Sequence, residues 1–220
     1  VVGMFSRKRF LSVFMIFAAL AVTPLCAQAA KRIYFAGYMG LKSYPPQDYK
    51  DNDLGLEGEI GVDDSISFAG AIGFKLTPQF RVEAELSHSS ADISSANITN
   101  FGSFEVGGSL DSTIAMVNVY YDFDFAWRKA QPFIGAGLGY GWHEGGIDNA
   151  LGFTANGSSE ADGYVWQVGG GVRYPISDSL SLISAYRYMD GQDLEFSTNE
   201  EVDTSAHEVR VGLSWDLPFE

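Results

Sequence analysis

The residues that come closest to a catalytic group are His88, Ser89 and Ser90, which end an alternating segment that begins at Arg81. A serine hydroxyl becomes a nucleophile when a base lies within hydrogen-bond reach, and histidine is the most common such base. His88 and Ser90 are two residues apart, so they would share one face of a β-strand. The spacing fits a hydrolytic pair with Ser90 as nucleophile and His88 as base. A solvated polar loop start, with no reaction, is the interpretation that we favour.

Other chemistry finds little support in the sequence. The three histidines, His88, His143 and His207, are scattered, and Cys26 is the only cysteine, so we expect no metal site. His143 and His207 are expected to be isolated and solvated at strand ends. Four glycines alternate along one segment instead of opening a helix, so they do not form a dinucleotide-binding loop (Gly135, Gly137, Gly139 and Gly141). We expect no cofactor, and we interpret these glycines as room for longer side chains inside the fold.

The charge balance argues against a nucleic-acid partner. The 220 residues include 14 Lys and Arg against 28 Asp and Glu, a net charge of −14. Proteins that bind nucleic acids need a basic surface to displace counterions. We therefore exclude this class of function.

The first residues have the layout of a secretory signal peptide. A basic segment, Arg7–Arg9, precedes an apolar run from Phe10 to Val22, and Ala27-Gln28-Ala29 offers small residues before a cut at Ala30. The apolar run is shorter than the roughly 20 residues that a membrane-spanning helix needs. We expect residues 1–29 to be a cleaved signal peptide and residues 30–220 to form one domain.

From Arg32 onward, apolar and small or polar residues alternate with the period of a β-strand. The clearest case is Val82, Ala84 and Leu86 against Arg81, Glu83 and Glu85. In the segment 112–125 both faces are apolar, and we assign Val117 outward and Asn118 inward. Eight such segments predict an all-β chain: 32–41, 66–75, 81–86, 112–125, 132–142, 166–174, 180–188 and 208–219.

Long and short connections alternate between these segments. The short ones are Thr77–Gln79, Arg128–Ala130 and Ile176–Asp178. The long ones include residues 89–109, 143–162 and 189–204, which we expect to be loops. Short turns at one end and long loops at the other are typical of an eight-stranded antiparallel up-and-down transmembrane β-barrel.

A soluble barrel of the lipocalin type also has eight antiparallel strands, so the two must be distinguished. The apolar stripes extend over roughly 9–11 residues, the length that crosses a bilayer when tilted. Aromatic residues gather at strand ends, as they do in the interfacial belts of membrane proteins (Phe74, Phe80, Phe125, Trp127, Tyr174 and Phe219). The opposite face carries glycine and charge, which suits the narrow interior of a small barrel. These features favour the membrane barrel.

Charged residues on the inward face need partners, because an unpaired charge in a tight interior is costly. The third and seventh strands lie opposite each other in a ring of eight, so Arg187 can reach toward Glu83 or Glu85. We expect a salt-bridged interior that closes the lumen; a gated narrow conduit lined by the same groups is the alternative. The expected network comprises Lys75, Arg81, Glu83, Glu85, Arg173, Arg187, Glu208 and Arg210.

Several segments resemble a known family. The segments Gln131–Gly141, Val117–Phe123, Arg81–Leu86 and Tyr186–Tyr188, in this order, are similar to the bacterial outer-membrane β-barrel domain family, which includes opacity-type and small porin-family surface proteins and is related to the OmpA-type transmembrane domain. The resemblance implies export through the periplasm, and insertion into the outer membrane of a Gram-negative cell by the barrel-assembly machinery. That machinery would read a C-terminal signal at Trp215, Leu217 and Phe219.

Two positions depart from the family pattern. His88 stands where the family usually has an aromatic residue, and Glu220 follows the terminal Phe219. A His-x-Ser sequence at a strand end also resembles the lipid A 3-O-deacylase barrels, although the asparagine expected after the serine is Ala91 here.

Together these patterns predict an integral outer-membrane barrel that is not an enzyme. Its expected role is structural or surface-exposed, in contact with the environment or a host. The alternatives are a narrow small-solute porin and a lipid A-modifying esterase. The expected partners are outer-membrane lipid and lipopolysaccharide, the assembly machinery, and an extracellular ligand of the loops.

Overall fold

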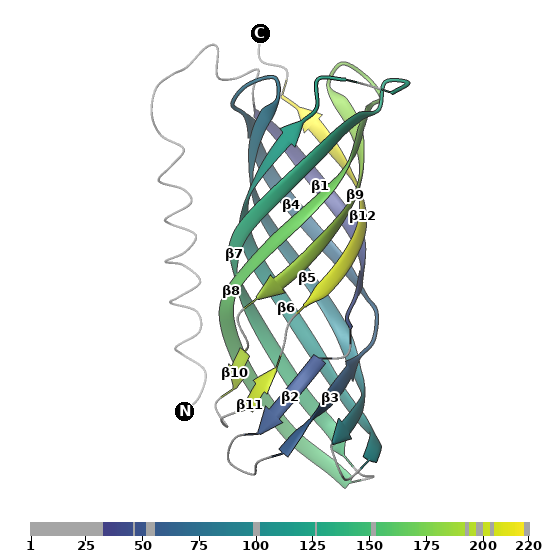
Figure 1. Ribbon diagram of the computed structural model, residues 1–220, viewed down its shortest axis with the longest axis vertical. Coiled ribbons are helices and arrows are strands. Elements are labelled where there is room, and N and C mark those ends of the chain that lie inside the picture. The colour runs from purple at the N-terminus through teal and green to yellow at the C-terminus, as the bar shows by residue number, and fades with distance from the viewer. Residues whose placement is uncertain are drawn as a thin grey trace.

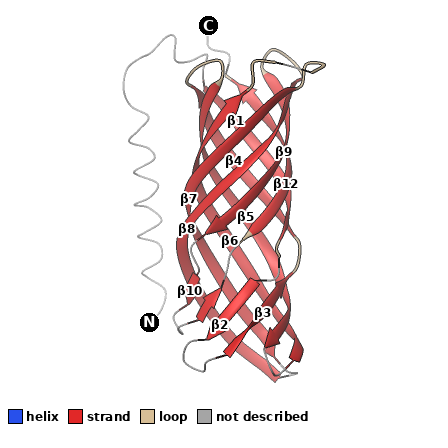
Figure 2. Ribbon diagram, in the orientation of Figure 1, coloured by secondary structure: helices blue, strands red, loops and turns tan. Residues whose placement is uncertain are grey.

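The computed structural model describes residues 33–45, 47–51, 56–98, 102–125, 127–150, 153–191, 194–196, 200–202 and 205–217. None of these residues belongs to a helix long and apolar enough to cross a membrane. They form twelve strands of one antiparallel sheet (Figures 1 and 2). The strands are β1 (Ile33–Ser43), β2 (Gln47–Asp51), β3 (Leu56–Val62), β4 (Ser65–Lys75), β5 (Phe80–Ile98), β6 (Gly102–Asp122), β7 (Gln131–Ala150), β8 (Phe153–Pro175), β9 (Leu180–Gly191), β10 (Leu194–Phe196), β11 (Glu200–Val202) and β12 (Ala206–Asp216).

Eight of these strands close into a barrel. The ring runs β1-β4-β5-β6-β7-β8-β9-β12 and returns to β1, with every neighbouring pair antiparallel. The closing seam joins the first and last strands, with Phe35 opposite Trp215 and Leu41 opposite Val209. A closed ring leaves no unpaired edge, which is the condition for placing strands in lipid. The predicted eight-stranded antiparallel barrel is confirmed.

The predicted alternation of faces is also confirmed. Apolar side chains such as Phe68 and Leu138 point outward and are 58% and 73% exposed. Their neighbours on the other parity, including Glu83 and Asn118, are fully buried in the interior. The segment that is apolar on both faces follows the assigned parity, because Val117 lies outward and Asn118 inward.

The expectation of long irregular loops is wrong. Strands β5 to β8 are 19 to 23 residues long, whereas β1, β4, β9 and β12 have 11 or 12. The strands therefore continue as hairpins through most of the segments 89–109 and 143–162. The short strands β2, β3, β10 and β11 extend the same end of the barrel, the lower end in Figure 1. The backbone ladder of the barrel therefore continues into these extensions.

The short connection between β6 and β7 is a tight turn made without glycine. Trp127 and Ala130 exchange two backbone hydrogen bonds of 2.9 Å, and Arg128 and Lys129 between them have φ angles of 51° and 74°. Two-residue hairpins favour positive φ at both central residues because this turn matches the twist of the strands. The guanidinium of Arg128 lies 5.3 Å from the centre of the Trp127 ring.

Interior tyrosines pack directly over glycines on the neighbouring strand. Tyr34 lies opposite Gly73, and a Cβ added to Gly73 would be 2.0 Å from the tyrosine ring. Tyr120 covers Gly135, where the corresponding distance is 2.2 Å. Gly135 therefore leaves interior room for a longer side chain opposite, as the sequence predicted.

This packing predicts opposite results for two glycine substitutions. Gly73→Ala should lower the free energy of unfolding by about 1–3 kcal/mol, the usual cost of overpacking, because the new methyl group overlaps Tyr34. Gly37→Ala should be neutral or slightly stabilising, because a Cβ there meets nothing within 4 Å. Urea titration of the protein folded in liposomes would measure both. Equal effects would contradict the interlocked packing.

Candidate functional site

The interior of the barrel holds a chain of ion pairs centred on Glu85 of β5. Its two carboxylate oxygens accept hydrogen bonds from Arg187 Nη1 of β9 at 2.7 Å and Arg210 Nη1 of β12 at 2.9 Å. All three side chains are buried. Arg187 does reach across the ring, as the sequence suggested, and its partner on β5 is Glu85. One carboxylate thus joins three strands.

Further polar side chains complete this cluster. Arg187 also donates to Glu208 Oε2 from Nε at 3.0 Å and Nη2 at 2.8 Å. The amides of Asn118 and Gln167 add further hydrogen bonds: Asn118 donates to Glu85, and Gln167 accepts from Arg187 at 2.8 Å and donates to Asn118 at 2.5 Å. Arg210 Nε has no partner among the described residues. Such connected networks are favourable in a low dielectric only when nearly every member is satisfied. The two amides were missed as partners, although their inward parity was readable.

A second cluster forms around Arg81. Its Nη1 lies 2.5 Å from Glu83 Oε1, and its Nε lies 3.1 Å from Asp122 Oδ2. Tyr34 donates to the same Glu83 oxygen at 2.5 Å, and the guanidinium lies 4.0 Å from the centre of the Tyr120 ring. Asp122 has the same inward parity as Asn118, four residues earlier, although it is not a member of the expected network.

Two expected members lie apart from these clusters. Lys75 pairs with Asp216 at 2.7 Å, and both side chains are about one-third exposed. Arg173 is buried against the ring of Tyr34, 5.6 Å from its centre, and its Nε and Nη2 have no partner among the described residues. The structure therefore brings six of the eight predicted charges into two buried clusters, and Lys75 into an exposed pair.

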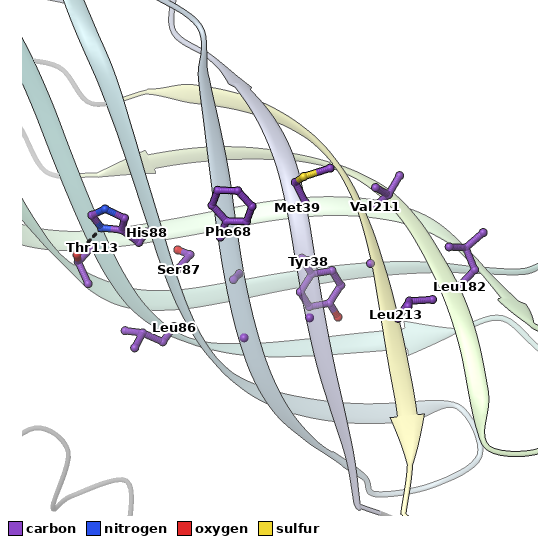
Figure 3. A pocket seen from close by; sticks show the side chains of 14 residues that line it. Tyr38, Met39, Phe68, Leu86, Ser87, His88, Thr113, Leu182, Val211 and Leu213 are labelled. Carbon is purple, nitrogen blue, oxygen red and sulfur yellow. Dashed lines mark hydrogen bonds between the residues drawn. The ribbon is translucent and has the colours of Figure 1, made fainter.

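The structure does not assemble His88 and Ser90 into a nucleophile–base pair. Both point outward from β5, and His88 Nδ1 bonds Thr113 Oγ1 of β6 at 3.1 Å (Figure 3). Within the described part of the chain no hydrogen bond joins His88 to Ser90. Ser89 points inward and accepts a hydrogen bond of 3.3 Å from Lys42. His88 is a side chain of the outer wall, not the start of a loop.

The expectation that His143 is solvated is wrong, and neither His143 nor His207 is isolated. His143 is buried inside the barrel, where its Nδ1 lies 2.9 Å from Ser112 Oγ. His143 has the same parity along β7 as the inward-facing glycines before it, so the sequence pattern indicates its interior position. His207 lies on the outer wall, bonded to the hydroxyl of Tyr186 at 2.7 Å and packed against Tyr188. Among the described residues, no three His, Cys, Asp or Glu side chains gather to hold a metal ion.

Two groups of aromatic residues mark the limits of the apolar band. At the end with the short turns, Phe80, Tyr121, Phe123 and Phe125 form a continuous row with ring centres 5.1 to 5.7 Å apart. Toward the other end, pairs of rings lie 5.4 to 5.6 Å apart (Tyr140–Trp142, Tyr140–Tyr164 and Trp166–Tyr188). Such belts lie at the two membrane–water interfaces of transmembrane barrels.

Comparison with known proteins agrees with this geometry. The family model of the outer membrane protein β-barrel domain matches residues 17–216. Outer membrane protein Omp38 of Acinetobacter baumannii is 26% identical over 162 residues, which cover 71% of this chain and 43% of that protein. The chain spans about half the length of the curated relatives that it matches.

Two solved structures share the fold. The outer membrane protein OprG from Pseudomonas aeruginosa has a TM-score of 0.58 at 13% identity, with 84% of this chain and 96% of OprG covered. The outer membrane protease OmpT from Escherichia coli has a TM-score of 0.54 at 7% identity, covering 88% of this chain and 99% of OmpT.

The central ion pairs predict a large effect of removing one charge. Glu85→Gln should lower the free energy of unfolding by about 3–5 kcal/mol, because it leaves Arg187 and Arg210 buried without their shared carboxylate. Lys75→Gln breaks an exposed pair, and should cost less than about 1 kcal/mol. Urea titration in liposomes would compare the two variants. Similar losses would show that Glu85 is not central to the interior.

The outward position of His88 predicts that the barrel does not hydrolyse lipid A. Expression of the native protein should leave the mass spectrum of lipid A unchanged, and so should expression of the His88→Ala variant. Loss of one acyl chain with the native protein but not with His88→Ala would reveal an esterase.

Proposed function

This chain belongs to the outer membrane β-barrel family, and from that premise we propose that it is a non-enzymatic surface protein with a closed lumen. It is an integral protein of the outer membrane. Its role in this proposal is structural and interactive: the barrel anchors the long hairpins, and the hairpins contact the environment or a host.

The observation that carries this proposal is the length of strands β5 to β8. Their 19 to 23 residues are about twice the roughly 9–11 residues that a tilted strand needs to cross a bilayer. In transmembrane barrels the short turns face the periplasm and the long connections face outward. The extended hairpins therefore stand on the outer side, well beyond the lipid.

The charge of this outer end favours particular partners. Five carboxylates around it are solvent-exposed: Asp63, Asp64, Asp92, Glu144 and Asp162. Lys42, which is paired with Ser65 beside Asp64, is buried inside the barrel. Such a surface attracts cationic partners, or anionic ones through divalent cations, and repels bare anions.

The closed lumen is supported by the size of the barrel and by its contents. Eight strands enclose an interior just wide enough for side chains. Here that space contains the network around Glu85, the cluster around Arg81 and, nearer the outer end, an apolar cluster of Ile114, Met116, Val165 and Met189. A narrow small-solute pore is the competing function, because the same charged groups would line it.

Assembly is part of the proposal. Trp215 points outward and is 53% exposed, and the Leu217 amide donates to the Ile33 carbonyl at 3.1 Å across the seam. Phe219 lies outside the described residues. We propose that these three residues form the signal for the barrel-assembly machinery.

Conductance separates the closed barrel from the pore. Purified protein in planar bilayers should show no steady channel. The double variant Glu85→Ala/Arg187→Ala removes both side chains of the central ion pair, and it should conduct small ions. A steady conductance of the native protein, unchanged in the double variant, would contradict the closed lumen and support the pore.

A further inference from the structure

Two glycines lie side by side on the lipid-facing wall without any packing reason. Gly37 of β1 is paired with Gly70 of β4, and both point outward. Interior glycines such as Gly73 and Gly135 are required by the tyrosine rings above them, but a Cβ on Gly37 or Gly70 would meet nothing within 4 Å. Glycine weakens a strand and often marks a place where something approaches the backbone closely. The outer wall therefore has a notch that the fold itself does not demand.

The notch lies in an open trough of about 650 Å³ along the outer wall (Figure 3). In the strand register, Leu86, Gly70, Gly37, Leu213 and Leu182 follow one another across five strands and form its floor. Phe68 and Met39 are also paired, and they form one side of the trough next to the glycines. Val211, which is paired with Met39, extends this side. The lining is almost entirely apolar.

The trough crosses most of the apolar band of the membrane. One end is at Leu182, two residues after the start of β9 at the short-turn end. The other end is at His88, eight residues after Phe80 begins β5. Eight residues rise about 27 Å along a strand, or about 20 Å along the membrane normal at the usual tilt, within an apolar band of about 25 Å. His88 therefore lies at the depth of the outer leaflet.

The outer end of the trough carries an incompletely bonded polar group. His88 Nδ1 is bonded to Thr113, but its Nε2 has no partner among the described residues. A polar ring atom on a lipid-facing wall is unfavourable unless it finds a hydrogen bond. Farther out on the same face are Ser90 and Asp92, so hydrogen-bonding groups continue outward from the trough.

We propose that this trough binds an acyl chain of lipid A, with His88 Nε2 hydrogen-bonded to a hydroxyl or amide group at the head of the chain. The trough is continuous with the lipid-facing surface of the barrel, so its occupant is hydrocarbon. Its polar end lies in the outer leaflet, where the lipid is lipopolysaccharide. The residues that line the trough include no Asp, Glu, Lys or Arg, so it has no group that would pair with a charged side chain.

Lipid retention by the whole protein tests this assignment. The barrel would be reconstituted in phosphatidylcholine vesicles that contain equal amounts of purified lipid A and phosphatidylethanolamine, with Mg²⁺ present. After extraction in mild detergent, native mass spectrometry would count each lipid per barrel. Heat-dependent migration in gels would confirm that each variant is folded.

Three variants give distinct expectations. Gly70→Leu fills the trough and should lower retained lipid A at least fivefold. Ala136→Leu adds similar bulk to an outward position on β7 away from the trough, and should change nothing. His88→Leu removes the polar end and should lower retention about fivefold, the equivalent of one hydrogen bond of about 1 kcal/mol.

Other outcomes overturn the proposal. Equal retention of phosphatidylethanolamine would remove the assignment to lipid A. Equal retention of lipid A by Gly70→Leu and the native protein would remove the trough as the site. A native dimer that Gly70→Leu dissociates, with no change in lipid, would make a second copy of the chain the occupant.

Discussion

A carboxylate buried inside a membrane barrel is stable only if cationic side chains contact it. The interior residues around Glu85 are arranged to meet this requirement. Burial of two charges is repaid only when geometry is good and the remaining hydrogen-bonding positions are filled. Here Arg187 and Arg210 come from the far side of the ring, and Asn118 and Gln167 add hydrogen bonds to Glu85 and Arg187. The strands are held at a fixed separation across the lumen as well as along the backbone ladder.

The fold was predictable because the membrane imposes a simple rule on each strand. Outward residues must be apolar and inward ones may be polar, so parity could be read even from the segment containing Val117 and Asn118. The rule lapses beyond the lipid, and there the sequence-based expectation failed. The sequence pattern predicts loops where the hairpins of β5 to β8 lie, because a strand surrounded by water does not need an apolar face.

The sequence predicted which charged residues face the interior, but not which of them form ion pairs with each other. Parity indicated that Glu85 and Arg187 both face inward, and the order of the strands brought them to opposite walls. It did not reveal that Asp122 would bind Arg81, or that Arg173 would pack on a tyrosine ring. Those choices depend on the stagger between strands, which is set by the whole ring. The trough was harder still to foresee, because it is defined by the side chains that Gly37 and Gly70 lack.

The tyrosine–glycine packing also bears on how the ring can close. Tyr38 of β1 lies over Gly212 of β12, where a Cβ would be 2.4 Å from the ring, and this pair spans the seam between the first and last strands. A slip of the last strand by two residues keeps every face correct, so hydrophobicity cannot detect it. It would, however, set the tyrosine against Ser214 or Arg210 in place of glycine. The packing of Tyr38 over Gly212 therefore disfavours closure of the barrel in a shifted register, even though such a register would keep the apolar side chains toward the lipid.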